Sequence, residues 1–220
     1  MGEMTVQTLL KKGAEASLFL ANWHGKRVVI KTRLVKEYRP AQLDKVIRDY
    51  RTVHEPQLMS EAKKVGVPTP IIFQVDVKNS TIVMEFVKGH QVKQLLGEFS
   101  AEKRKDVFLR VGELIGKLHL SGVIHGDLTT SNIILTAEDK IFLVDFGLGE
   151  KNVELEAKGV DLHLMKRALQ STHFQFADEC FAAIAKGYSS VLGEQAKDVL
   201  DKVKEIERRG RYVAERQQDV

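Results

Sequence analysis

The chain is poor in the residues that mark several common classes of protein. A single cysteine in 220 residues excludes a disulfide framework and a cysteine-rich zinc module. Four prolines and sixteen glycines exclude fibrous and low-complexity repeats. No apolar run approaches the ~20 residues that a membrane helix needs, and the first residues lack the basic start and long apolar segment of a signal peptide. We therefore expect a cytoplasmic protein that makes no contact with a membrane.

The rest of the composition predicts a folded chain whose charge is unevenly distributed along the sequence. Hydrophobic residues make up 43% of the chain, which is enough for the core of one domain, or of one domain in two small lobes. The net charge is only +4, but residues 25–51 hold nine Lys or Arg against three Asp or Glu, and four arginines lie in the last thirteen residues. Such stretches are either solvated faces or patches that bind a polyanion or an acidic partner.

The pattern of apolar residues predicts a strand-rich first part and a helix-rich second part. In the first part we expect one helix, with Pro56 either bending it or starting a second helix. The predicted strands of this part are 16–21, 27–34, 71–76 and 81–86, and the predicted helix is 41–65. In the second part we expect strands at 132–135 and 141–144, and helices at 101–120, 159–171, 173–191 and 193–209. Together these elements predict an α+β fold.

Two short motifs in the second part carry the strongest chemical signal. They are His125-Gly126-Asp127-Leu128-Thr129-Thr130-Ser131-Asn132 and Val144-Asp145-Phe146-Gly147. Phosphoryl transfer from ATP needs a carboxylate to position the acceptor and oxygen ligands for magnesium. Asp127, Asn132 and Asp145 can supply them from two neighbouring loops. Each motif alone would be read as turn residues, but the pair in this order and spacing indicates a metal–nucleotide site.

Two weaker signals lie upstream of these motifs. Lys31 ends an apolar strand segment and can hold phosphates if a carboxylate orients it, with Glu55 and Glu61 as candidates. The segment Gly13-Ala14-Glu15-Ala16-Ser17 lies before that strand, where a phosphate-covering loop would stand. It holds a single glycine, and Glu15 places a carboxylate where anions should bind.

The order of these features resembles the eukaryotic-type protein kinase superfamily over most of the chain. Finer matches resemble the small kinase subunit of the KEOPS complex, the PRPK family. They are Lys36-Glu37-Tyr38-Arg39-Pro40 with Leu43-Asp44, Gly66-Val67-Pro68-Thr69-Pro70, the HGDLTTSN loop at 125–132, Val160-Asp161-Leu162, Ser171-Thr172-His173 and the basic tail. The resemblance implies a minimal bilobal kinase-like fold in a single domain, residues 1–220. Its parts would be an N-lobe at about 1–86, a hinge at 86–91, a C-lobe at 92–207 and a basic tail at 208–220.

The resemblance also implies roles for individual residues, with ATP and Mg²⁺ as cofactors. Asp127 would be the catalytic carboxylate, while Asn132 and Asp145 would bind magnesium. Lys31 would contact the phosphates, paired with Glu55 rather than Glu61, although Pro56 replaces the usual alanine. Asp161 would anchor the catalytic loop, and the nucleotide would be held by Gly13, Ala14, Glu15, Ala16, Ser17, Val29, Met84, Glu85, Phe86, Val87 and Ile134.

The function implied is that of a serine/threonine protein kinase, an ATPase, or both. It would support threonylcarbamoyladenosine modification of tRNAs reading ANN codons, with the threonylcarbamoyl-transferase subunit and other KEOPS subunits as partners. tRNA contact would come through residues 25–51 and Arg208, Arg209 and Arg211. Only 14 residues, 148–161, follow the Asp-Phe-Gly motif up to Asp161, which leaves little room for a phosphorylated activation segment or a peptide groove. The alternatives are a small-molecule phosphotransferase, which would need a larger helical insert, and a non-catalytic scaffold, which would have lost a metal or phosphate residue.

Overall fold

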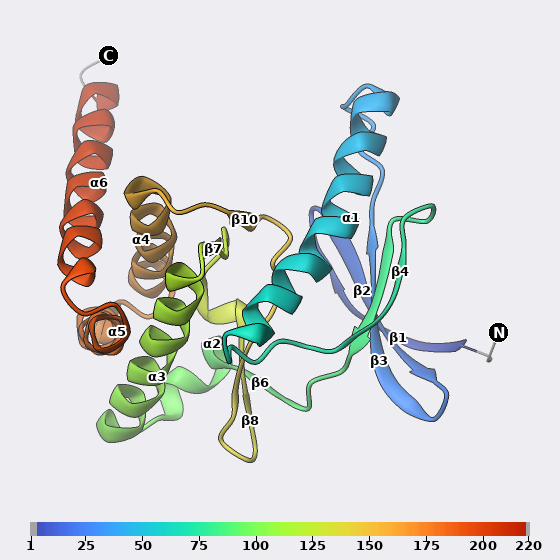
Figure 1. The fold of residues 1–220 in the computed structure, drawn as a ribbon, viewed down its shortest axis with the longest axis horizontal. Coiled ribbons are helices and arrows are strands. Elements are labelled where there is room, and N and C mark those ends of the chain that lie inside the picture. The colour runs from blue at the N-terminus through green and yellow to red at the C-terminus, as the bar shows by residue number, and fades with distance from the viewer. Residues whose placement is uncertain (1–3, 219–220) are drawn as a thin grey trace.

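The computed structural model describes residues 4–218, apart from the side chains of residues 4, 6, 7 and 210–218. The N-terminal part is a five-stranded antiparallel sheet with the order β1-β2-β3-β5-β4, next to one long helix, α1 (Figure 1). The strands are β1 (Met4–Lys12), β2 (Ala16–Trp23), β3 (Lys26–Arg33), β4 (Ile72–Asp76) and β5 (Thr81–Glu85).

The alternation of side chains along β3 divides its residues between the two faces of the sheet. Val28 and Ile30 belong to a small apolar cluster on one face, together with Ala21 and Val83. Val29, Lys31 and Arg33, at the alternate positions of the strand, face the other side of the sheet, where Val29 packs against the main core. The central strand therefore delivers two cations to the side of the sheet that faces α1.

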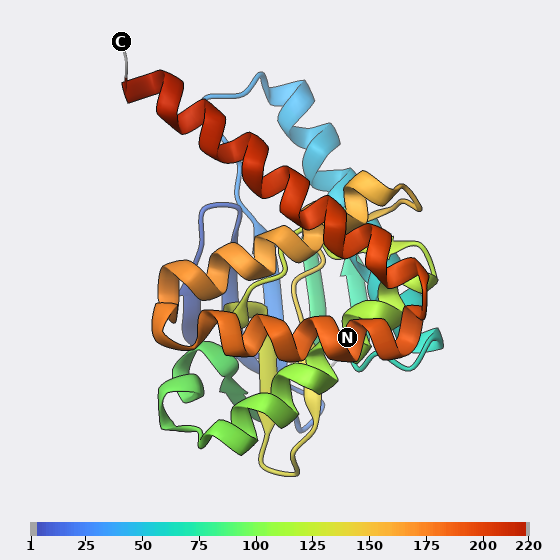
Figure 2. The same ribbon diagram turned by 90° about the vertical axis from the view of Figure 1, so that its left-hand side faces the viewer.

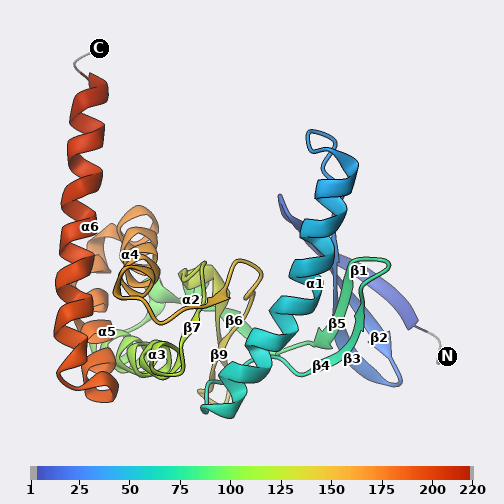
Figure 3. The ribbon, with the colours of Figure 1, turned by 45° about the horizontal axis from the view of Figure 1, so that its top comes forward.

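Helix α1 (Ala41–Lys64) runs without interruption through Pro56. The sequence left open a bend or a second helix at this proline, and the structure assigns a single helix. A proline inside a helix lacks the N–H that would bond to the carbonyl four residues earlier, here that of Thr52. The second half of α1 packs Leu58 and Met59 into the core, whereas its first half extends beyond the sheet (Figures 1 and 3).

The C-terminal part is mostly helical. The chain enters it through β6 (Gly89–Gln91), α2 (Val92–Leu95) and the short 3₁₀ helix η1 (Leu96–Glu98). The remaining elements are α3 (Ala101–Leu120), β7 (Val123–Ile124), η2 (Thr130–Asn132), β8 (Ile133–Thr136), β9 (Ile141–Leu143), β10 (Glu150–Lys151), α4 (Leu155–Thr172), η3 (Phe174–Phe176), α5 (Ala177–Leu192) and α6 (Gln195–Gln218). Ser100 caps α3, because its hydroxyl accepts a hydrogen bond from the Lys103 amide at 3.2 Å.

The helices of this part form one core around α3 and α5. Glycine allows the two helices to approach closely, since a Cβ at Gly112 would lie 2.1 Å from the Ile184 carbonyl oxygen and one at Gly187 would lie 1.9 Å from that of Leu109. Helix α6 packs against α4 and α5, passes over one end of α4 in Figure 2, and continues nine residues beyond its predicted end at residue 209. In the part of the chain that the structure describes, no helix has both the length and the apolar character to cross a membrane.

Candidate active site

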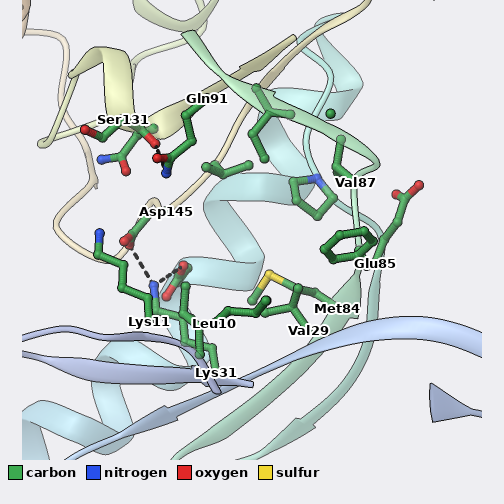
Figure 4. Close-up of a pocket in the computed structure, with 18 of the residues that line it drawn as sticks. Leu10, Lys11, Val29, Lys31, Met84, Glu85, Val87, Gln91, Ser131 and Asp145 are labelled. Atoms are coloured by element: carbon green, nitrogen blue, oxygen red, sulfur yellow. Dashed lines mark hydrogen bonds and ion pairs between the residues drawn. The ribbon is translucent and has the colours of Figure 1, made fainter. Parts of the chain in front are cut away.

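Lys31 pairs with two carboxylates, one from each part of the molecule. Its ammonium donates to Glu55 Oε1 on α1 at 2.8 Å and to Asp145 Oδ1, after β9, at 2.7 Å (Figure 4). Lys31 and Glu55 are almost fully buried, whereas the Asp145 side chain is 43% exposed. The structure thus selects Glu55 over Glu61, which lies at the surface and pairs with Lys64 and Lys151.

This arrangement sets the charge of both partners at neutral pH. Burial acts to lower the pKa of Lys31, but the charges of Glu55 and Asp145 outweigh it and hold the pKa above its usual value. Burial likewise acts to raise the pKa of Asp145, and the charge and hydrogen bond of Lys31 reverse the sign, leaving that pKa lowered. The site therefore presents a cation and a half-exposed anion side by side.

The loop that carries Asp127 is held by its own asparagine. Asn132 Nδ2 donates to the Asp127 carbonyl at 2.9 Å and to its Oδ2 at 2.8 Å.

Asp145 adopts the left-handed backbone region with a φ of +65°, which is uncommon outside glycine and is found at functional sites. The ring of Phe146 is buried 4.4 Å from that of His125, so the residue after Asp145 is fixed in the core.

These residues fit a magnesium ion that is shared with a nucleotide. Asn132 and Asp145 offer the amide and carboxylate oxygens that Mg²⁺ prefers, and Asp127 lies beside Asn132. Among the described residues, no group of three or more His, Cys, Asp or Glu side chains is placed to hold a metal by itself. A bound Mg²⁺ would accordingly complete its coordination with phosphate oxygens and water, as in kinases.

Asp161 on α4 holds the loop that carries Asp127 by hydrogen bonds, in the position that the resemblance implied. Its carboxylate accepts hydrogen bonds from the His125 and Gly126 amides, both at 2.9 Å, and from His119 Nε2 at 3.1 Å. His119 in turn bonds to the Tyr188 hydroxyl at 2.9 Å. Burial acts to raise the pKa of Asp161, yet the hydrogen bond and charge of His119 bring it below the usual value.

A cavity of about 350 Å³ opens beside Lys31, between the sheet and β8. Its apolar walls suit a planar base, and residues 85–87 line it, so main-chain groups of this segment that are not already bonded to Ile71 and Arg27 can bond to the base. Ten residues predicted for the nucleotide site line it: Val29, Lys31, Glu55, Met84, Glu85, Phe86, Val87, Asn132, Ile134 and Asp145.

A second cavity of about 190 Å³ lies next to the first, at the end where terminal phosphates would lie. Lys31 and Asp145 line both cavities, and Asp127 lines the second. The predicted loop residues Gly13, Ala14, Glu15 and Ala16 line it as well, whereas Ser17 is buried in β2 and lines neither. Glu15 is neutralised by Arg51 at 3.0 Å and Arg39 at 3.7 Å, which explains how a carboxylate can stand in this loop.

The sequence did not single out several residues that the structure places in the first cavity. The most informative is Lys11, whose side chain extends toward Asp145 (Figure 4) and lines both cavities. The register between β1 and β2 shifts between Leu9 and Lys11, and both Leu10 and Lys11 line the first cavity. A basic residue two positions before Gly13 was the signal that could have found it.

The basic stretch 25–51 has less free charge than its composition suggested. Six of its nine cations form ion pairs within the chain: Lys31, Arg33, Arg39, Lys45, Arg48 and Arg51. In the tail, Arg208 is exposed and Arg209 pairs with Glu156 at 2.6 Å, while the Arg211 side chain lies outside the described residues.

Comparison with known proteins identifies the family to which this geometry belongs. The protein kinase domain family matches residues 5–190. The chain is similar to the KEOPS complex subunit Bud32 of Pyrococcus abyssi, at 44% identity over 93% of this chain and 96% of that protein. It is also 42% identical to a probable bifunctional tRNA threonylcarbamoyladenosine biosynthesis protein of Methanothermobacter thermautotrophicus, over 93% of this chain but 36% of that longer protein.

Solved structures agree on the fold. The crystal structure of the Rio2 kinase from Chaetomium thermophilum matches 93% of this chain and 73% of its own, with a TM-score of 0.63 at 18% identity. The α+β bilobal kinase-like fold predicted from the sequence is thereby confirmed. Together with the match to Bud32 over nearly its whole length, it shows that the chain belongs to the protein kinase family and, within it, to the family of the KEOPS kinase subunit.

Proposed function

We propose that this protein binds Mg–ATP in the cleft and transfers or hydrolyses its terminal phosphate. The observation that carries the proposal is the contact of Lys31 with both Glu55 and Asp145, at the junction of two cavities that can take a base and a phosphate chain. Asp127 borders the phosphate end, where an acceptor would approach.

Each residue then has a distinct task. Lys31 neutralises phosphate oxygens, while Asn132 and Asp145 hold Mg²⁺, which supplies the positive charge that the transferring phosphoryl group needs. Asp127 orients the attacking oxygen of a hydroxyl or of water and accepts its proton. The bond between Asn132 and Asp127 fixes the direction of that carboxylate before the nucleotide arrives.

The second part of the proposal is that ATP hydrolysis is at least as important as phosphorylation of serine or threonine. The segment from Leu148 to Asp161 is short, and its only strand, β10, pairs with β7 next to the catalytic loop. It leaves no long activation segment to support a peptide. Water is an acceptor that needs no such support.

The third part is the place of this chemistry in tRNA modification. One relative is named as a KEOPS complex subunit, and others are named as bifunctional tRNA threonylcarbamoyladenosine biosynthesis proteins in which this chain spans about a third of the length. We therefore propose that the protein is a cytoplasmic KEOPS subunit that binds the threonylcarbamoyl-transferase subunit. Arg208 and the arginines after it are the proposed tRNA contacts, and binding through them should weaken steeply with salt.

Hydrolysis of radiolabelled ATP by purified protein tests the chemistry. Asp127→Asn and Lys31→Met should each reduce phosphate release at least about a hundredfold, a loss typical for a group that acts in the transition state. Asp106→Asn, the same kind of change on the surface of α3, is the matched control and should match the wild type. Equal activity in wild type and Asp127→Asn would reject Asp127 as the catalytic carboxylate.

The partner proposal has its own test. Adding the transferase subunit and tRNA should change the hydrolysis rate or form a complex that is visible by size-exclusion chromatography. Phosphorylation of a small hydroxyl compound, without any effect of these partners, would instead support a small-molecule phosphotransferase. Partner binding with no nucleotide binding would support a scaffold.

A further inference from the structure

A second buried cation, Arg33, lies two residues after Lys31 on the same face of β3. Its side chain is 3% exposed and forms an ion pair with Glu55 through the carboxylate oxygen that Lys31 does not use. Its Nη2 also donates to the Arg51 carbonyl at 3.1 Å, one helical turn before Glu55. Arg33 is therefore bound to α1 at two points, and Glu55 is held from both sides.

The contacts continue from Arg51 to the phosphate-covering loop. The guanidinium of Arg51 donates to Glu15 Oε2 at 3.0 Å. One series of contacts consequently runs from Asp145 through Lys31, Glu55, Arg33 and Arg51 to Glu15. It joins the loop after β9, β3, α1 and the β1–β2 turn, all of which contribute to the lining of the second cavity.

We propose that Arg33 is a positioning residue that keeps the pair of Lys31 and Glu55 assembled without any phosphorylation event. In a kinase whose helix can move outward, the lysine–glutamate pair is a switch that activation-segment phosphorylation controls. Here a buried guanidinium takes the second oxygen of the glutamate and a main-chain carbonyl of the same helix. Moving α1 outward would leave Arg33 buried without its partners, which is costly.

The inference concerns positioning and rests on the proposed nucleotide chemistry. Arg33 lines the second cavity, and its Nη2 makes both contacts, to Glu55 and to the Arg51 carbonyl, while its buried Nε has no partner among the described residues. The proposal is that Arg33 acts on the reaction through Glu55 rather than by touching the nucleotide. The double change Arg33→Met with Glu55→Gln separates these roles. If Arg33 acts through Glu55, its loss matters only while Glu55 can orient Lys31.

The experiment measures kcat and KM for ATP hydrolysis, per mole of folded protein, for both single variants and the double variant. We expect Arg33→Met to lower kcat/KM at least about tenfold, Glu55→Gln to lower it by a similar or larger factor, and the double variant to be within about twofold of Glu55→Gln. Arg33→Lys, which can make one of the two contacts, should recover part of the loss. Arg110→Met removes an arginine that also bridges two acceptors, on α3, and should behave as wild type.

Two outcomes would overturn the inference. Losses that multiply in the double variant would mean that Arg33 acts independently of Glu55, and wild-type kinetics in Arg33→Met would mean that it positions nothing. Should Arg33→Met not fold, Arg33→Lys in both Glu55 backgrounds gives the same comparison. An inactive wild-type protein that also fails to bind ATP would reject the proposed function instead, so the two failures are distinguishable.

Discussion

Two neighbouring lysines at the end of β1 differ in what they face. Lys11 lines both cavities, whereas Lys12 lines neither. Lys11 forms no ion pair within the described residues, so its charge is available to the phosphates of a nucleotide. Lys11 would thus supply a contact to the phosphates that the backbone N–H groups of a glycine-rich loop supply in other nucleotide-binding proteins.

Replacing Lys11 with Met should therefore raise the KM for ATP about threefold to tenfold, the effect of losing one partly solvated charge contact. Lys12→Met is the matched control, since it removes the same charge from the adjacent position. Steady-state kinetics with ATP measure both. An equal change in the two variants would show that only the general charge of the strand matters.

Asp161 should give the protein part of its resistance to acid. Its folded-state pKa is lowered, so its contribution to stability is complete above the unfolded value of about 3.9 and is lost as the pH falls through the folded value. Asp161→Asn should cost about 3 kcal/mol at pH 7, because the amide cannot accept from all three donors. Urea unfolding from pH 7 to pH 3 should show a smaller loss of stability for the variant than for the wild type, and parallel curves would contradict the assignment.

At the scale of elements, the close contact of α3 and α5 depends on glycine. Gly187→Ala would place a methyl group 1.9 Å from a main-chain oxygen, so the two helices must move apart. We expect a loss of about 2–4 kcal/mol in the free energy of unfolding, measured by chemical denaturation. Gly97→Ala, where a Cβ would meet nothing within 4 Å, should change it by less than about 1 kcal/mol.

The sequence predicted those parts of the site whose chemistry restricts the residue type. Asp127, Asn132 and Asp145 stand in short motifs, and the pattern of strands and helices correctly predicted the order of the larger elements from β2 onward. It gave no range for β1, β6, β7, β10 or α2. It could not decide between Glu55 and Glu61, because the choice depends on how α1 lies against β3. It also missed Lys11 and the partners of Arg33, since a register shift in β1 and contacts across 22 residues leave no local pattern. The roles of the site residues stay predictions until the variants are measured.

At the scale of the whole molecule, the first half of α1 carries exposed apolar side chains. Leu43, Val46, Tyr50 and Val53 recur at helical spacing and are 39–65% exposed. This half of the helix extends away from the sheet, on the same side as the end of α6 (Figure 3). Large apolar side chains gathered on one exposed helix face are typical of a surface that another subunit covers.

Val46→Asp should accordingly weaken binding to another KEOPS subunit at least about tenfold, by placing a charge in an apolar contact. Isothermal titration with each purified subunit measures the effect, and circular dichroism checks that the helix is intact. Val153→Asp, at a valine outside α1 that is also strongly exposed, is the control. Unchanged binding to every subunit would show that the stripe is not an interface.

The backbone at Gly126 bears on whether phosphorylation can regulate this protein. Its φ is +78°, and a Cβ there would lie 2.2 Å from the Leu148 carbonyl oxygen, so the arginine that precedes the catalytic aspartate in regulated kinases has no room. An arginine at this position therefore cannot bind a phosphate group on the segment that follows Asp145. We therefore expect that phosphorylation of that segment does not switch the activity of this protein.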